Sequence, residues 1–357
     1  MKTKILPPTN ENIEYAARIL KEGGLVAVPT ETVYGLAANA LDKTAVNNIF
    51  KVKKRPADNP LIVHISSINE IPDSINIPEP AQKLMDAFWP GPLSVVLPKP
   101  PEIPDIVTAG LDSAAFRVPS NPVALRIIKS AGVPLAAPSA NSSGRPSPTS
   151  AEHTAQDIGG KIPLIIDGGH CTVGIESTVV RIQNNKVHIL RPGMITVQMM
   201  EELGIDTAEC AGIADITGIN NTKENFKNKD PMDPRPRSPG IKHRHYSPNA
   251  EVILVKSNKH NKPALEAFIA YVKEHGGDRV FAMVYEGEQN MVENAKAVVF
   301  GKRSNPKSLA HSFYSCLREV DNQNGKTLYI RCLDEKEMGS AVYDRITRAA
   351  NNKTVYI

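Results

Sequence analysis

The residues most able to do chemistry in this sequence are cations and hydroxyls that stand beside short apolar runs. The densest group is Lys51–Arg55, in which four of the five residues are cationic. Arginine binds phosphate through paired hydrogen bonds and lysine acts as a point charge, so this run suits a polyphosphate. A solvated helix end is the commoner fate of such a run. The run leads into the apolar stretch Leu61–Ile65, which contains His64. A ligand-binding role and a place in the core are about equally consistent with this histidine.

Hydroxyl groups gather in two further stretches, each directly after an apolar run. Pro29–Leu36 places two threonines and a carboxylate at a strand end, which suits a small polar ligand, although a turn with Thr30 capping the next helix is the simpler interpretation. Ala137–Thr149 is serine-rich, contains three prolines and leads to a T-x-x-E capping box formed by Thr149 and Glu152. Backbone N–H groups at a helix N-terminus favour anions, so we predict an anion-binding loop here rather than a flexible surface loop.

Two arginines complete the set of candidate residues. Arg117 interrupts an apolar, strand-like stretch, where it forms either a structural ion pair or a carboxylate-binding site, since a charge is rarely buried without a partner. Arg191 ends the second strand of a hairpin predicted around Asn184–Asn185, and it points either into the same pocket or to the surface. Cys171 follows His170, but sequence neighbours rarely present both groups in relay geometry, so we treat this cysteine as incidental.

Together these stretches hold many cations and hydroxyls, few carboxylates and no evident nucleophile. The motifs of P-loops, dinucleotide-binding folds, zinc helices and nucleophile elbows are absent from the sequence. Such a set favours the positioning and charge neutralisation of phosphates over hydrolysis through a covalent intermediate.

The apolar runs that must position these residues alternate between strand-like and helix-like patterns. They intermix up to about residue 205, which predicts an α/β or α+β domain built on a mixed sheet. Residues 220–239 are polar and rich in proline, as is typical of a linker, and the alternation that follows predicts a small doubly wound domain. The predicted strands cover 25–28, 61–65, 93–97, 134–137, 164–166, 177–182, 187–190, 252–255, 280–285, 297–300 and 327–332, and the predicted helices cover 13–20, 81–88, 122–129, 263–274, 309–320 and 341–350.

Composition sets further limits on the class of protein. The chain of 357 residues is long enough for two domains. Its 42 Lys and Arg against 38 Asp and Glu give a formal charge of +4, far below that of a DNA-coating protein. The four cysteines are widely spaced, so we expect neither a disulfide framework nor a cysteine-rich zinc site. Because no run of about 18 apolar residues and no signal-peptide pattern occurs, we expect no membrane span and a cytoplasmic location.

Five motifs in a fixed order resemble a known family. PTETVYGL, KKRPADNPL, SANSSGRPSPT, GIESTVV and ILRPG resemble the motifs of the YrdC-type L-threonylcarbamoyladenylate synthases, and residues 238–248, SPGIKHRHYSP, resemble the tether of the longer two-domain form. The resemblance implies an N-terminal YrdC-like α/β domain with a twisted mixed sheet (1–205) and a linker or lid (206–248). It also implies a smaller C-terminal Rossmann-like, doubly wound α/β domain (249–357).

The same resemblance implies a nucleotidyltransferase reaction. L-threonine, bicarbonate and ATP would give threonylcarbamoyl-AMP and pyrophosphate, with ATP as a substrate and Mg²⁺ as the metal. In the family, a carbamate formed on the threonine amine attacks the α-phosphate, and this displacement needs clamps more than a protein nucleophile. The product would supply the threonylcarbamoyl group of the tRNA adenosine beside the anticodon. The expected partners are therefore a downstream tRNA-modifying transferase complex and, weakly, RNA, with no membrane partner.

The resemblance also implies a set of site residues, carried over motif by motif. Lys53 and Arg55, from the K-x-R signature, are the implied catalytic residues, and whether Lys53 or Lys54 faces the pocket is left open. The implied ATP-binding residues are Arg55, Asn59, Ser113, Ser139, Asn141, Ser147, Arg191 and Tyr246. The implied threonine-binding residues are Thr32, His64, Arg117, Ala137 and Ser177, and the metal ligands stay unknown.

Two alternative functions stay open. A non-catalytic RNA-binding module would account for the basic run, but aromatic residues for base stacking make up only 5% of the chain and no RNA-recognition signature is present. A carbamoyl-transfer enzyme of the same fold, active in hydrogenase maturation, would need acylphosphatase-like and zinc-finger segments that the sequence lacks. The C-terminal domain carries no reactive cluster, and we expect it to act with its tether as a lid that retains the labile product.

Overall fold

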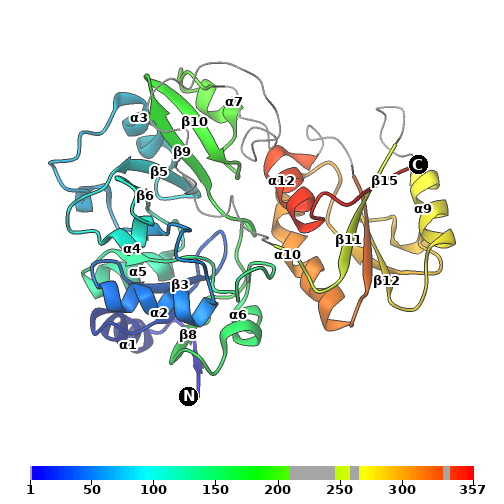
Figure 1. Ribbon diagram of the computed structural model, residues 1–357, viewed down its shortest axis with the longest axis horizontal. Coiled ribbons are helices and arrows are strands. Elements are labelled where there is room, and N and C mark those ends of the chain that lie inside the picture. The colour runs from blue at the N-terminus through cyan, green and yellow to red at the C-terminus, as the bar shows by residue number, and fades with distance from the viewer. Residues whose placement is uncertain (1, 209–245, 258–264, 333–337) are drawn as a thin grey trace.

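The computed structural model describes residues 2–208, 246–257, 265–332 and 338–357. In these residues the chain forms two sheets, each with its own helices, and the two units lie side by side (Figure 1). We call the elements from Lys4 to Glu201 the first domain and those from Glu251 to Tyr356 the second domain. The predicted lid, residues 206–248, lies almost wholly outside the described residues, and so does the predicted linker at 220–239.

The first domain is built on a sheet that mixes parallel and antiparallel neighbours, as predicted. Its ten described strands are, in sheet order, β1 (Lys4–Leu6), β8 (Leu164–Ile166), β2 (Val26–Val28), β3 (Gly35–Asn39), β7 (Leu135–Ala136), β4 (Ile62–His64), β6 (Ser113–Arg117), β5 (Leu93–Pro98), β9 (Thr178–Gln183) and β10 (Lys186–Arg191). Strand β4 runs parallel to β6 and antiparallel to β7, while β5 runs parallel to β9 and antiparallel to β6. The strands that carry the basic, serine-rich and arginine stretches are therefore neighbours in the centre of one sheet.

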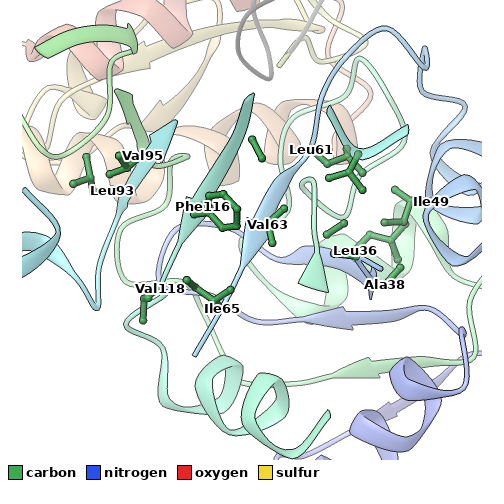
Figure 2. Packing of buried hydrophobic residues seen from close by; sticks show 14 of the residues in the cluster. Leu36, Ala38, Ile49, Leu61, Val63, Ile65, Leu93, Val95, Phe116 and Val118 are labelled. Carbon is green, nitrogen blue, oxygen red and sulfur yellow. The ribbon is translucent and has the colours of Figure 1, made fainter. Parts of the chain in front are cut away.

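The helices of the first domain cover the apolar faces of this sheet. They are α1 (Asn10–Lys21), α2 (Lys43–Lys53), α3 (Glu79–Phe88), α4 (Asp105–Thr108), α5 (Pro122–Ala131), α6 (Ala151–Ile158) and α7 (Val197–Glu201), with a short 3-10 turn at Ile68–Glu70. In the main core, side chains of β4, β5 and β6 such as Val63, Val95 and Phe116 pack together, and Ile49 of α2 packs near Leu36 of β3 (Figure 2). This core holds the inner strands rigid, so their ends can fix polar side chains in place.

Two local predictions need correction. The helix after the serine-rich loop is capped by Ser150, whose hydroxyl accepts a hydrogen bond from the N–H of His153, and not by Thr149. No helix follows Thr30: its hydroxyl accepts from the N–H groups of Thr32 and Val33 in a turn that leads into β3. Strand β3 escaped prediction because Gly-Leu-Ala-Ala-Asn contains no β-branched residue.

The second domain is the predicted doubly wound unit. Its five described strands are all parallel, in the order β13 (Lys296–Val299), β12 (Val280–Val284), β14 (Thr327–Arg331), β11 (Glu251–Lys256) and β15 (Thr354–Tyr356). Its helices are α9 (Leu265–Glu274), α10 (Pro306–Asn322) and α12 (Ser340–Ala349), with a 3-10 turn at Gln289–Met291. Helices α10 and α12 lie on the face of the sheet turned toward the first domain, and α9 lies on the opposite face (Figure 1).

The two domains share one apolar cluster. Val33 and Ile175 of the first domain pack with Tyr246 and with residues of α10 such as Phe313. At this contact Gly174 has a φ of +86°, and a Cβ added there would lie 2.5 Å from Cα of His311. The loop that carries Gly174 therefore touches the backbone of α10 directly. None of the helices in the described parts of the chain is both long and apolar enough to span a bilayer.

The close approach at Gly174 predicts a strong effect of a single methyl group. Gly174→Ala should lower the free energy of unfolding by about 3 kcal/mol, because it adds overpacking against α10 to the strain of a positive φ. Gly169→Ala is the matched control, since Gly169 has a φ of +78° with nothing within 4 Å of its added Cβ, and it should cost only about 1 kcal/mol. Denaturant unfolding of both variants gives the measurement, and equal losses would contradict the close approach.

Candidate functional site

A cavity of about 60 Å³ lies over the ends of the central strands of the first sheet. Residues from all five of the family-like motifs, PTETVYGL, KKRPADNPL, SANSSGRPSPT, GIESTVV and ILRPG, line this cavity. The sequence-predicted residues among them are Thr32, Arg55, His64, Arg117, Ala137, Ser139, Ser177, Arg191 and Tyr246. Cavities that hold drug-sized ligands usually measure about 300–1,000 Å³, so the described arrangement keeps the wall residues in contact with one another and must widen to admit a large ligand.

Arg117 is both an ion-pair partner and a wall residue of the cavity. From the end of β6 its Nη2 donates to Glu31 Oε1 at 2.6 Å, its Nη1 to Thr32 Oγ1 at 2.9 Å and its Nε to the carbonyl of Gly91 at 3.2 Å. Burial raises the pKa of the Glu31 carboxyl, but the charge of Arg117 outweighs it and holds this pKa below its usual value. Two of the five N–H groups of the guanidinium stay available for a carboxylate in the cavity.

His64 stands beside Arg117, at the end of the parallel neighbour β4. Its Nδ1 lies 3.2 Å from the carbonyl oxygen of Ile62. Burial, aided by the positive charge of Arg117, lowers the pKa of His64 to about 3. The ring is therefore neutral at physiological pH, and it offers a hydrogen bond rather than a charge to whatever enters the cavity.

The basic run divides into buried and exposed cations. Lys53, the last residue of α2, is buried, and its Nζ donates to the carbonyls of Ser139 and Asn141 at 2.5 Å each. Lys54 is exposed and has a φ of +53°, which turns the chain out of the helix. The structure thus selects Lys53 as the inward lysine, although it contacts the serine-rich loop and is not among the residues that line the cavity.

Arg55 is the cation of this run that reaches the cavity. Its Nε donates to the carbonyl of Asn59 at 3.3 Å and its Nη2 to that of Pro60 at 3.1 Å. Burial lowers the pKa of Arg55 to about 10, which still leaves the group protonated at neutral pH. Because both of these partners are carbonyls, the group keeps its positive charge and can bind an anion.

The serine-rich loop is fixed by its own hydrogen bonds. Asn141 Oδ1 accepts from the hydroxyl of Ser139 at 2.5 Å, and its Nδ2 donates to the carbonyl of Arg145 at 2.8 Å. Residues 146–150 are buried, so the alternative of a flexible surface loop is wrong. Ser139 lines the cavity but no residue of α6 does, so the loop, and not the N-terminus of that helix, reaches the site.

Arg191 points into the cavity and not to the surface. It is buried, and its Nε and Nη2 donate to the carbonyl and the hydroxyl of Ser177, both at 3.1 Å. The Ser177 hydroxyl also lies 2.8 Å from that of Ser94 on β5. The hairpin therefore places a cation and a hydroxyl together on one wall.

Sequence reasoning missed Glu176, the acidic residue that lines the cavity. Its carboxylate accepts from Ser147 Oγ at 2.5 Å, from the hydroxyl of Tyr314 at 2.9 Å and from Nε of Arg345 at 3.0 Å. The signal was a lone carboxylate inside the apolar GIESTVV stretch, in a site otherwise poor in acids. No sequence pattern pointed to Tyr314 or Arg345, which lie 138 and 169 positions away in the second domain.

Several predicted site residues do not line the cavity. They are Lys53, Asn59, Ser113, Asn141 and Ser147. Three of them form hydrogen bonds with residues that do line it: Asn59 with Arg55, Asn141 with Ser139, and Ser147 with Glu176. Ser113 begins β6 while Arg117 ends it, so the two lie roughly 13 Å apart along the strand.

Comparisons with known proteins agree on one family. Residues 18–193 match the Sua5, YciO and YrdC family model, described as telomere recombination, and residues 195–351 match the model described as threonylcarbamoyl-AMP synthase, C-terminal domain. The threonylcarbamoyl-AMP synthase of Pyrococcus abyssi is 39% identical over 97% of this chain and 96% of its own length. That of Bacillus subtilis is 37% identical over 99% and 97%. The crystal structure of P. abyssi Sua5 complexed with L-threonine superposes with a TM-score of 0.83 at 36% identity, covering 99% of this chain and all of that one.

The buried neutral state of His64 predicts a pH dependence of stability. Below its ordinary pKa of 6.5 the unfolded chain binds a proton that folded His64 does not take up until about pH 3, so the free energy of unfolding falls as the pH falls through this window. Between pH 7 and pH 5 the wild type should lose about 2 kcal/mol more than His64→Gln. Denaturant unfolding at both pH values measures this, with exposed His275→Gln as the control. Equal losses in His64→Gln and wild type would refute it.

Proposed function

Because this chain belongs to the threonylcarbamoyl-AMP synthase family, we propose that it converts L-threonine, bicarbonate and ATP into threonylcarbamoyl-AMP and pyrophosphate. The observation that carries the proposal is one small cavity in which Arg117 stands with two further guanidinium groups, those of Arg55 and Arg191. A carboxylate at one end of the cavity and phosphates at the other would match these cations.

Threonine occupies the end of the cavity near Arg117 in this proposal. The two remaining N–H groups of that guanidinium bind the threonine carboxylate, and the anchoring contacts to Glu31 and Thr32 keep the group in place. His64, Ala137 and Ser177 complete this end, and all line the cavity. The similar P. abyssi Sua5 structure is a complex with L-threonine, which supports threonine as a ligand of this chain.

ATP occupies the end near Arg55 and Arg191. These two cations, with Ser139 and Tyr246, line the cavity and would contact the nucleotide directly. The other ATP-binding residues that we propose, Asn59, Ser113, Asn141 and Ser147, would contact it once the cavity widens. Lys53 contributes by holding the carbonyls of the Ser139–Asn141 loop, so that the loop meets the phosphates in one conformation.

The chemistry is a displacement at the α-phosphorus of ATP. Bicarbonate and the threonine amine form a carbamate and release one water. A carbamate oxygen then bonds to the α-phosphorus, and the bond from that phosphorus to the bridging oxygen of the β-phosphate breaks. Pyrophosphate leaves with the electron pair. Buried guanidinium groups stabilise the charge that spreads over the phosphate oxygens, which is the main need of such a transfer.

Magnesium would enter with ATP and would not be held by a protein cage. Among the described residues no three His, Cys, Asp or Glu side chains form a group that could hold a metal ion. Both oxygens of Glu176, the carboxylate at the cavity, already accept hydrogen bonds. Mg²⁺ usually keeps its waters and binds substrate phosphates with only one or two carboxylates, so we treat Mg²⁺–ATP as the substrate and assign no step to the metal.

The product is a reactive anhydride whose threonylcarbamoyl group would pass to a tRNA adenosine beside the anticodon, through a downstream transferase complex. A weak RNA contact of this chain would belong to that transfer. The alternative of a non-catalytic RNA-binding module finds no support in the comparisons, since the relatives that this chain matches over nearly its whole length are threonylcarbamoyl-AMP synthases.

Pyrophosphate release tests the proposed reaction. With ATP, Mg²⁺ and bicarbonate, wild-type protein should release pyrophosphate only when L-threonine is present. Arg55→Ala should lower the rate about 100-fold, because a cation that would face the phosphates is lost. Lys51→Ala, which removes an exposed lysine from the same helix, is the control and should keep the wild-type rate. Release that does not depend on threonine would reject the synthase function.

The anchored guanidinium of Arg117 predicts a defect confined to one substrate. Arg117→Lys replaces a planar fork with a point charge, so the KM for threonine should rise about tenfold while the KM for ATP changes less than twofold. Steady-state kinetics with each substrate varied in turn measures the split. Exposed Arg126→Lys should leave both values unchanged. A rise in the KM for ATP alone would place threonine elsewhere.

A further inference from the structure

Glu176 is the point at which the cavity and the two domains meet. It lines the cavity from the first domain, and it is buried against two side chains of the second domain, Tyr314 on α10 and Arg345 on α12. Arg345 is fully buried and forms an ion pair with Glu176 at 3.0 Å. Resting on the proposed function, we propose that Arg345 and Tyr314 are positioning residues of the ATP site and act through Glu176.

The first step is the charge of Glu176. Burial alone raises the pKa of this carboxyl, but the charges of Arg345 and Arg191 and the hydrogen bond from Ser147 hold it below its usual value. Glu176 is therefore an anion beside a site that must accept a polyphosphate. An unpaired anion there would repel the nucleotide, and Arg345 is the side chain of the second domain that balances it.

The second step is the orientation of the Glu176 carboxylate, which in turn orients the Ser147 hydroxyl. Its Oε1 accepts from the hydroxyl of Ser147 at 2.5 Å, and its Oε2 accepts from Arg345. The Tyr314 hydroxyl lies within 3.0 Å of both oxygens, and burial followed by the charge of Glu176 raises the pKa of Tyr314, so the group stays protonated and donates. With three donors around it, the carboxylate has one orientation, and that orientation fixes the Ser147 hydroxyl on the serine-rich loop.

The third step is a second wall residue held by the same pair. The guanidinium of Arg345 lies 5.4 Å from the ring centroid of Tyr246, and the ring of Tyr314 lies 5.6 Å from it. Tyr246 lines the cavity. Arg345 is itself oriented by Asp344, whose Oδ2 accepts from its Nη1 at 2.6 Å. Two side chains of the second domain thus support two residues that line the cavity, Glu176 and Tyr246.

A merely adhesive role for these contacts makes a different prediction, and the chain offers a matched control. Arg318 of α10 is equally buried and pairs across the domain boundary with Asp157 at 2.8 Å. Its hydrogen bonds go to the carbonyls of His153 and Pro146 and to Asp157, and not to Glu176. If the second domain serves only to adhere, losing either arginine should have the same consequences for the kinetics.

The test is a double-mutant cycle read through two Michaelis constants. Arg345→Met leaves the Glu176 anion unpaired, so the KM for ATP should rise about tenfold while the KM for threonine changes less than twofold. In a Glu176→Gln background there is no anion to leave unpaired, and Arg345→Met should then change the KM for ATP less than twofold. Arg345→Lys should restore part of the loss. Arg318→Met should change the KM for ATP by the same factor in both backgrounds.

Tyr314→Phe keeps the inference testable if Arg345→Met does not fold. It removes one hydroxyl and keeps the packing of the ring, and it should raise the KM for ATP about threefold with the KM for threonine unchanged. A rise of both constants together, or an equal effect of Arg345→Met with and without the Glu176 carboxylate, would overturn the inference.

Binding of α,β-methylene-ATP, measured by calorimetry on the same proteins, separates this inference from the proposed reaction. Coupling between Arg345 and Glu176 in the affinity for this analogue supports the inference even if the wild type releases no pyrophosphate. Threonine-dependent release by the wild type without such coupling would leave the reaction standing and overturn the inference alone.

Discussion

The ion pair between Glu176 and Arg345 is the interaction on which the arrangement of the site depends. It joins the GIESTVV stretch of the first domain to α12 of the second, and both partners are buried. Burying a charge without a partner costs free energy. Each domain therefore needs the other to compensate the charge that is buried at this contact. The shared apolar cluster around Val33 and Ile175 excludes water from the pair and so strengthens it.

The two ends of the cavity use cations in different electrostatic states. Arg117 is paired with the Glu31 carboxylate, which cancels most of its charge and leaves directional N–H groups. Arg55 donates to the carbonyls of Asn59 and Pro60, which are dipoles and not charged groups. A singly charged amino acid needs orientation, whereas a polyphosphate needs net positive charge, and the two anchoring modes match these needs.

Sequence patterns predicted those features whose causes are local. The hairpin around Asn184–Asn185 was predicted correctly because both residues adopt the positive φ that a tight turn requires, at 52° and 61°. The burial of Arg117 followed from its apolar neighbours. The inward direction of Lys53 could not be predicted, because its partners on the serine-rich loop are more than 80 positions away and only the fold brings them close. The contacts of Arg345 and Tyr314 with Glu176 were hidden for the same reason, and the Ser150 cap was missed because two adjacent hydroxyls compete for one role.

The pairing of β15 with β11 has a consequence for how the protein is made. All strands described for the first sheet precede residue 192, so that sheet can form while the ribosome is still adding the rest of the chain. The second sheet needs Thr354–Tyr356 to cover the edge of β11. At about 5–20 residues per second, the first domain waits roughly 8–30 s with Glu176 lacking Arg345. During biosynthesis the nascent first domain therefore holds Glu176 without its ion-pair partner until translation is nearly over.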